Sequence, residues 1–207
     1  MTKRKKPILL FLQIESMRCF FIISWMLFCA TSYSQTTMDD NLIEWSSESK
    51  LMWSDFKASA KSTNLPNARA QCTSRYNYKF FLKNDSLYFS IVSVFVQSDS
   101  WKDNFILDEY DLLHEQKHFD ITELFARYIR KEIIEKQLNE EGIAKLIGQK
   151  QTECEMFQKL YDKETKHSLD RRSQEKWNQK IDSLLNSMDK YKNQPLYIED
   201  PWCKVCW

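Results

Sequence analysis

From residue 107 onward, apolar side chains recur every three or four positions, which is the spacing of residues on one face of an α-helix. The whole chain of 207 residues holds only 2 Gly and 4 Pro, so few positions favour a break or a tight turn. The pattern predicts three long helices, over about Leu107–Lys136, Glu140–Lys166 and Asp170–Lys192. Folds made of many short strands and disordered chains are excluded by the same composition.

A period of two precedes the helices. Tyr76, Tyr78 and Phe80 alternate with polar residues, and a second alternating segment begins at Leu87 after the turn-forming stretch 83–86. This predicts an antiparallel β-hairpin with one buried face. Two shorter apolar segments, near 42–45 and 51–56, predict a strand and an extended or one-turn segment. The predicted fold class is therefore α+β, with an N-terminal antiparallel β-hairpin sheet followed by three long helices.

The N-terminus has the features of a secretory signal. An apolar run over Cys19–Ala30 follows a single Arg and precedes the small residues Ser32 and Ser34. The run is shorter than the roughly 20 residues that a membrane-spanning helix needs. We therefore expect a bacterial Sec-type signal peptide that is cleaved near Gln35, which predicts a periplasmic or secreted protein.

The expected organisation has three parts. Residues 1–34 form the cleaved signal peptide, 36–195 form one domain, and 196–207 form a cysteine-containing C-terminal tail. Translation starting at Met17 instead of Met1 would shorten the positively charged beginning of the signal, and the sequence leaves both starts open.

Four cysteines remain after the expected cleavage: Cys72, Cys154, Cys203 and Cys206. Export places them in an oxidising compartment, and four thiols allow three pairings, between which the sequence does not choose. The final C-x-x-C favours a structural disulfide over a redox centre, because the chain ends one residue later and offers no helix N-terminus to lower a thiol pKa.

The charge balance excludes several classes of partner. Residues 35–207 carry 25 basic and 28 acidic side chains, interspersed along the chain, so no basic stripe predicts nucleic-acid binding. No apolar stretch of the mature chain is long enough to span a membrane. We expect a monomer. The expected partner is a peptide or protein substrate, and one sequence motif is the reason for this expectation.

That motif is His114-Glu115-Gln116-Lys117-His118, an H-E-x-x-H sequence within the first expected helix. Residues four apart on a helix project from the same face, so His114 and His118 can bind one metal ion while Glu115 stands beside them. A zinc ion held by imidazoles activates a water molecule, and the adjacent carboxylate takes its proton. Glu115 is the expected catalytic residue, and a zincin-like arrangement with the motif on the first long helix is the expected architecture.

A catalytic zinc site needs a third protein ligand. The last histidine of the chain, His167, lies near the end of the second expected helix, and an antiparallel helix pair could return it to the motif. Glu164 and Asp162 lie close by in sequence and are the alternatives. We predict that His114, His118 and His167 bind zinc, with one of these carboxylates as the competing third ligand.

Several stretches resemble a bacterial family called domain of unknown function 922, described as predicted secreted zinc-dependent proteases. They are LMWSDF, SVFVQSDSW, LLHEQKHFDITELFARYIRK, YDKETKHS and QEKW, and the resemblance covers about residues 42–185. The resemblance implies a zinc site at the H-E-Q-x-H-F-D core and at the Y-D-x-E-T-x-H stretch. The family has Gly after the last His, whereas this chain has Ser168.

Three functions are compatible with the residues. The first is an exported zinc-dependent metallopeptidase that hydrolyses peptide bonds through a metal-activated water, with an edge strand of the hairpin sheet aligning the peptide. The second is a non-catalytic, zinc-containing envelope protein. The third is a cell-wall amide hydrolase. The carboxylate of Glu115 favours a catalytic role, because a structural zinc site does not need it.

Overall fold

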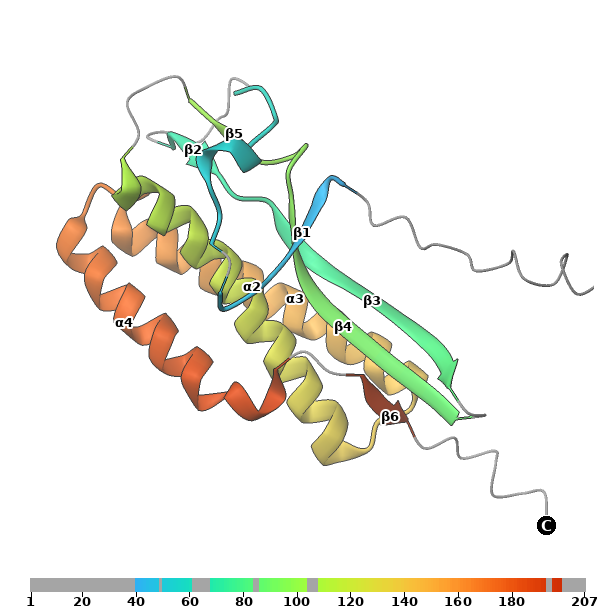
Figure 1. The fold of residues 1–207 in the computed structure, drawn as a ribbon. Coiled ribbons are helices and arrows are strands. Elements are labelled where there is room, and N and C mark those ends of the chain that lie inside the picture. Colours follow the sequence, from blue (N-terminus) through green and yellow to red (C-terminus); the bar gives the residue numbers. More distant parts are fainter. Residues whose placement is uncertain are drawn as a thin grey trace, which may run out of the picture. The chain divides into compact units, whose positions relative to one another are not determined.

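The computed structural model confirms an α+β fold with an antiparallel sheet and three long helices (Figure 1). The expected signal peptide and the two tail cysteines lie outside the residues that it describes. The described residues are 40–48, 50–60, 68–83, 86–103, 108–192 and 195–198.

The main sheet is built on the predicted hairpin. Its two long strands pair antiparallel with Tyr78 opposite Ile91 and Phe80 opposite Phe89, so the alternating apolar residues form one continuous face. Residues 196–198, at the start of the expected tail, pair with the same central strand as the short N-terminal strand. The strands are β1 (Leu42–Glu44), β3 (Ser74–Lys83), β4 (Ser86–Val96) and β6 (Leu196–Ile198), in the order β1-β4-β3, with β6 also on β4.

The three helices begin at side-chain caps. Asp108 accepts hydrogen bonds from two backbone N–H groups of the first helical turn, and Asn139 and Asp170 each accept one. These short polar side chains satisfy N–H groups that have no partner within the helix. The helices are α2 (Glu109–Lys136), α3 (Glu140–Thr165) and α4 (Arg171–Ser187). The last ends five residues before the predicted limit, where a 3-10 turn, η2 (Asp189–Tyr191), follows.

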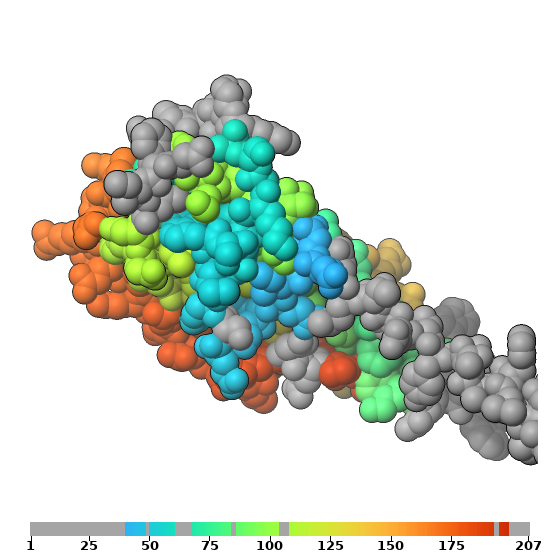
Figure 2. All heavy atoms as spheres, turned by 45° about the horizontal axis from the view of Figure 1, so that its top comes forward, coloured from blue at the N-terminus to red at the C-terminus, as the bar shows by residue number. Residues whose placement is uncertain are grey.

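Helix α2 lies at the centre of this unit. Its residues contact the sheet on one side and both α3 and α4 on the other, so Ile121 and Leu124 are fully buried. Figure 2 shows the segment 40–60, in blue and cyan, spread over the adjoining face of the molecule. Within it, the Leu51 N–H donates to Gln116 Oε1, and the Trp45 indole N–H donates to Asp120. The part of α2 that carries the motif, residues 114–127, is therefore buried on all sides.

Burial of α2 extends to its charged residues. Glu123 is 2% exposed, and its carboxylate accepts hydrogen bonds from Arg127, Arg130 and the Ser93 hydroxyl at 2.9 to 3.2 Å. Both guanidinium groups also donate to backbone carbonyls, Arg127 to that of Leu185 and Arg130 to that of Ile91 on β4. A buried charge is tolerated only when it is paired and hydrogen-bonded. This network of charged and polar groups links α2 to β4 and to α4 through hydrogen bonds.

Removing the carboxylate takes the counter-charge from the buried Arg130 and leaves the buried Arg127 with only the exposed Asp189, 3.6 Å away. We expect Glu123→Ala to lower the free energy of unfolding by about 3 kcal/mol or more, measured by urea unfolding. The control is Glu132→Ala on the same helix, where a more exposed carboxylate pairs with Lys136 and Lys150, and there we expect about 1 kcal/mol or less. Equal losses in the two variants would contradict this account of the network.

A second, two-stranded sheet forms beside the N-terminal half of α2. It pairs β2 (Ala70–Gln71) with β5 (Trp101–Lys102), and β5 also bridges to Ala58. A one-turn 3-10 helix, η1 (Trp53–Asp55), occupies the segment that was expected to be extended or one turn long. No strand was predicted from the sequence between the hairpin and the first long helix, so this small sheet was not foreseen.

Candidate metal centre

The two motif histidines project from the same face of α2. His114 and His118 are 3% and 7% exposed, and their ring centroids are 4.9 Å apart. Tyr161 of α3 stacks on the His114 ring, with centroids 4.7 Å apart, and its edge meets His118. Two imidazoles one helical turn apart are therefore held side by side beneath α3.

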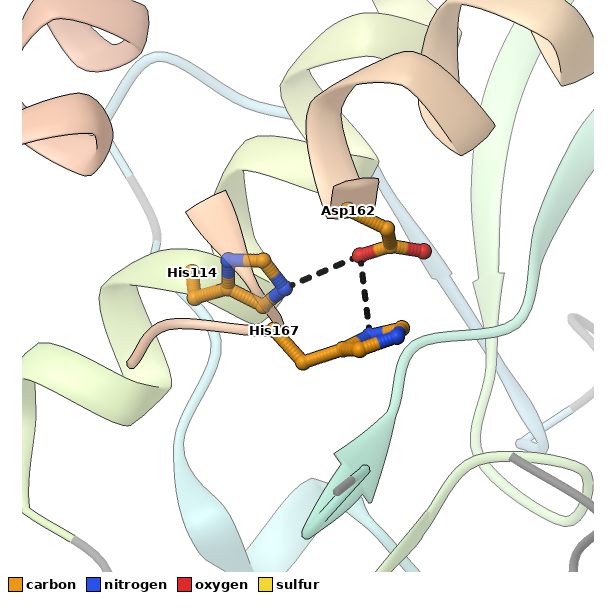
Figure 3. A group of neighbouring side chains, drawn as sticks. All are labelled: His114, Asp162 and His167. Carbon is orange, nitrogen blue, oxygen red and sulfur yellow. Dashed lines mark hydrogen bonds and ion pairs between the residues drawn. The ribbon is translucent and has the colours of Figure 1, made fainter. Parts of the chain in front are cut away.

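The end of α3 supplies the remaining donor atoms. Asp162 Oδ1 lies 3.2 Å from His114 Nε2, 2.9 Å from His118 Nε2 and 3.3 Å from His167 Nδ1. Figure 3 shows the carboxylate of Asp162 between the rings of His114 and His167. One donor atom from each of these three residues lies within 4.8 Å of the others. Three imidazoles thus surround a single carboxylate oxygen.

His167 reaches this position through an unusual turn. Lys166, His167 and Ser168 all have positive φ, at 51°, 51° and 70°, although none is glycine. Each such residue carries strain, and runs of them persist where surrounding contacts hold them. Here the backbone N–H of His167 donates to the Asp162 carbonyl at 3.1 Å. The turn therefore reverses the chain so that His167 faces the last turn of α3.

The other nitrogen of each motif ring faces a glutamine. Gln174 Oε1 lies 2.8 Å from His114 Nδ1, and Gln158 Oε1 lies 3.0 Å from His118 Nδ1. The amide nitrogens of both glutamines donate elsewhere, to Asn178 in the first case, which orients the oxygens toward the rings. With Nδ1 of each ring hydrogen-bonded to a glutamine oxygen, Nε2 is the nitrogen that faces the cluster. A metal ion would bind at this nitrogen in place of a proton.

Glu115 lies in the same cleft. It is 5% exposed, and its Oε2 accepts a hydrogen bond from the backbone N–H of Cys72 at 2.7 Å. The cleft has a volume of about 300 Å³ and opens between the segment that contains β2 and one side of α3. Its lining residues from these two walls are Ala68, Ala70–Ser74, Gln151, Glu155, Gln158 and Lys159, and its floor is formed by His114, Glu115, His118, Asp162 and His167.

The charges of the cluster are coupled. Burial alone would lower the pKa of His118, but the Asp162 carboxylate outweighs it and raises this pKa to about 9. Burial would raise the pKa of Asp162, yet the two motif imidazoles hold it far below its usual range. In the metal-free protein, a protonated His118 therefore balances the negative charge of Asp162. A bound cation would take over this role.

This coupling predicts how the stability of the metal-free protein varies with pH. A His pKa raised from 6.5 to about 9 stabilises the fold fully below pH 6.5, and this contribution is lost as the pH rises through 9. The lowered pKa of Asp162 stabilises the fold above pH 3.8 and is lost below it. Urea unfolding of chelator-treated protein should show a decline between pH 6.5 and 9. Asp162→Asn should flatten it, and an equal decline in that variant would contradict the pairing.

The expected site residues fall into two groups. His114, Glu115, His118 and His167 line one cleft, together with Asp162, one of the two alternative ligands. Glu164, the other alternative, lies elsewhere and accepts a hydrogen bond from the Trp177 indole at 2.8 Å. The donor atoms that all lie within 4.8 Å of one another belong to His114, Asp162 and His167, whereas the expected ligand His118 joins this group only through its 2.9 Å contact with Asp162. Gln158 and Gln174 were missed, because nothing in their spacing marks them as partners of the motif.

Two of the four cysteines lie among the described residues. Cys72 is half-buried and lines the cleft, Cys154 of α3 is buried in the core, and neither forms a disulfide there. Burial raises the pKa of both thiols. The expected disulfide of the tail stays a prediction.

The imidazole nitrogens and the Asp162 carboxylate suit a divalent cation that takes nitrogen and oxygen ligands. Three imidazole nitrogens face one carboxylate, which supplies the negative charge that a cation needs. A scan against protein-family models, a search of curated proteins and a search of solved structures each gave no match. Among the helices that the structure describes, none combines the length and the apolar character needed to cross a bilayer. The chemistry of the cleft therefore carries the functional argument.

Proposed function

We propose that this protein is an exported, zincin-like zinc metallopeptidase of the H-E-x-x-H type. The observation that carries the proposal is the convergence of three imidazole nitrogens and the Asp162 carboxylate in a cleft that also contains Glu115. Export rests on the signal-like sequence of the first 34 residues, and the resemblance to the predicted secreted proteases points the same way.

His114, His118 and His167 would hold the zinc ion, and Asp162 would face it. A catalytic zinc site has three protein ligands and one open position, and the cleft offers access to such a position. When bound, zinc acidifies a coordinated water and polarises the carbonyl of the scissile bond. The three imidazoles, being neutral ligands, would leave the ion its full charge for this purpose.

Glu115 would move the protons. Its carboxylate would accept a proton from the attacking water and return it to the leaving amine, which is the role of a general base and then a general acid. The Cys72 N–H orients this carboxylate by a hydrogen bond to Oε2, and burial excludes competing water from it. Glu115 therefore has a fixed orientation before a substrate enters.

A peptide fits the wall of the cleft. The Asp103 N–H donates to the Arg69 carbonyl, so the backbone polar groups of residues 69 and 71 point toward β5. Backbone polar groups alternate in direction along a strand, so those of Ala70 point away from β5. Cys72 follows the same alternation, because its N–H reaches Glu115. Among the described residues, no strand pairs with the outer edge of β2, so an extended chain could hydrogen-bond there. We had expected an edge of the hairpin sheet in this role, whereas the cleft is walled by β2.

The test combines metal analysis with a cleavage assay. We expect purified mature protein to contain one zinc ion per chain and to cut an unfolded protein substrate. Chelation should abolish cleavage, and zinc, but not magnesium, should restore it. Zinc bound without any cleavage would favour the non-catalytic envelope protein. Release of fragments from purified cell wall, with unfolded proteins left intact, would favour the amide hydrolase.

A further inference from the structure

One buried carboxylate joins three elements around the cleft. Asp111 lies in the first turn of α2 and is 7% exposed. Its Oδ1 accepts hydrogen bonds from the Ser168 hydroxyl, at 2.7 Å, and from the Arg69 guanidinium. Its Oδ2 accepts from the backbone N–H of Asp108 at 3.3 Å, which closes the cap of the helix. Asp111 does not line the cleft itself.

The two residues whose side chains bind Asp111 each adjoin part of the site. Ser168 follows His167 directly, and Arg69 precedes Ala70 on the cleft wall. Asp111 itself lies three residues before His114, so it shares one helical face with the first motif histidine. The carboxylate therefore connects the turn that carries His167 to the helix that carries the other two imidazoles.

From these contacts, and resting on the proposed zinc site, we propose that Asp111 is a positioning residue that holds His167 at the metal. The turn at 166–168 consists of three left-handed residues without glycine, so it would relax if nothing held it. The Ser168 hydroxyl is 2.7 Å from Asp111, and Ser168 is 7% exposed. This hydrogen bond anchors the strained turn to α2 next to the site.

Partners that orient a metal ligand from outside commonly account for 10- to 100-fold in metal affinity. We therefore expect Asp111→Ala to weaken zinc binding by about 10- to 100-fold, measured by competition with a chromophoric chelator. Ser168→Ala removes only the hydroxyl contact and should weaken binding in the same direction. If Asp111→Ala folds poorly, the Ser168→Ala variant still tests the proposal. The visible spectrum of the Co²⁺-substituted variants should approach that of His167→Ala.

A double-mutant cycle separates positioning from general destabilisation. If Asp111 acts through His167, adding Asp111→Ala to His167→Ala should change zinc affinity by less than about twofold. The matched control is Asn139→Ala, which removes the exposed side-chain cap of α3, a hydrogen bond to the Gly142 N–H at the end of that helix away from the site. Its zinc affinity should stay within about twofold of the wild type.

The outcomes distinguish this proposal from the proposed function. Unchanged zinc affinity in Asp111→Ala and Ser168→Ala would overturn the positioning role, while cleavage by the wild type would still support the peptidase. An equal loss in the presence and absence of His167 would overturn it as well. Wild-type protein that binds zinc with no cleavage would remove the peptidase and leave the affinity ratios to decide on Asp111. Wild-type protein that binds no zinc would overturn both.

Discussion

Glu115→Gln is expected to lower the turnover number of peptide cleavage by about 10³- to 10⁴-fold while one zinc ion stays bound per chain. Glutamine has nearly the same shape as glutamate, and its amide oxygen can still accept the hydrogen bond from Cys72. It cannot accept a proton from water. The substitution therefore removes the proton transfer and leaves the fold and the imidazole ligands intact.

The matched control for this variant is Glu155→Gln. Glu155 lines the same cleft, but it is exposed, and its carboxylate accepts a hydrogen bond from Gln151 at 2.9 Å. Its turnover should stay within a few-fold of the wild type. Turnover and zinc content are measured on the same preparations. If Glu115→Gln cleaved as fast as Glu155→Gln, Glu115 would have no part in the proton transfer.

The fold was predictable where its signals are local. The alternation in 74–96 and the three-and-four spacing after residue 107 both reflect how neighbouring residues share one face. The juxtaposition of His114 and His118 follows from the same geometry, since both lie on one helix. The pairing of β2 with β5 joins residues about thirty positions apart through two paired residues on each side, and no periodicity marks such a short contact.

The limits of sequence reasoning are clearest in α2. Apolar stripes predicted one buried face, whereas Lys117, Asp120 and Glu123 are buried as well. Lys117 donates to Asp120 at 2.9 Å and also pairs with Asp182 of α4, so its charge is neutralised by a partner 65 residues away. Polar residues in a helix predict exposure unless their partners are known, and the partners here come from other elements.

The choice of the third zinc ligand also depends on contacts between elements that are distant in sequence. Sequence reasoning left His167, Glu164 and Asp162 as alternatives, because the choice depends on which face the last turn of α3 presents to α2 and on the turn after it. Glu164 faces Trp177, while the other two reach the motif. The left-handed turn at 166–168 contains no glycine, so nothing in the sequence predicts it. Its stability comes from contacts such as that of Ser168 with Asp111.

The ligand set can be resolved by comparing His167→Ala with Asp162→Asn. We expect His167→Ala to weaken zinc binding by more than about 100-fold, because it removes a donor rather than an orienting partner. Asp162→Asn should weaken it by about 10- to 100-fold, since it removes only the charge that faces the ion. His118→Ala, which deletes a motif ligand, gives the reference for the loss of a direct bond.

Zinc stoichiometry after dialysis and affinity by chelator competition provide the two measurements. If His167→Ala retained zinc and Asp162→Asn lost it, Asp162 would replace His167 as the third ligand. His167 would then be free to hydrogen-bond a substrate from the same position, 3.3 Å from that carboxylate. Loss of zinc to the extent of His118→Ala in both variants would indicate four protein ligands. Such a closed site has no open position for water, so it would favour a structural zinc ion over a catalytic one.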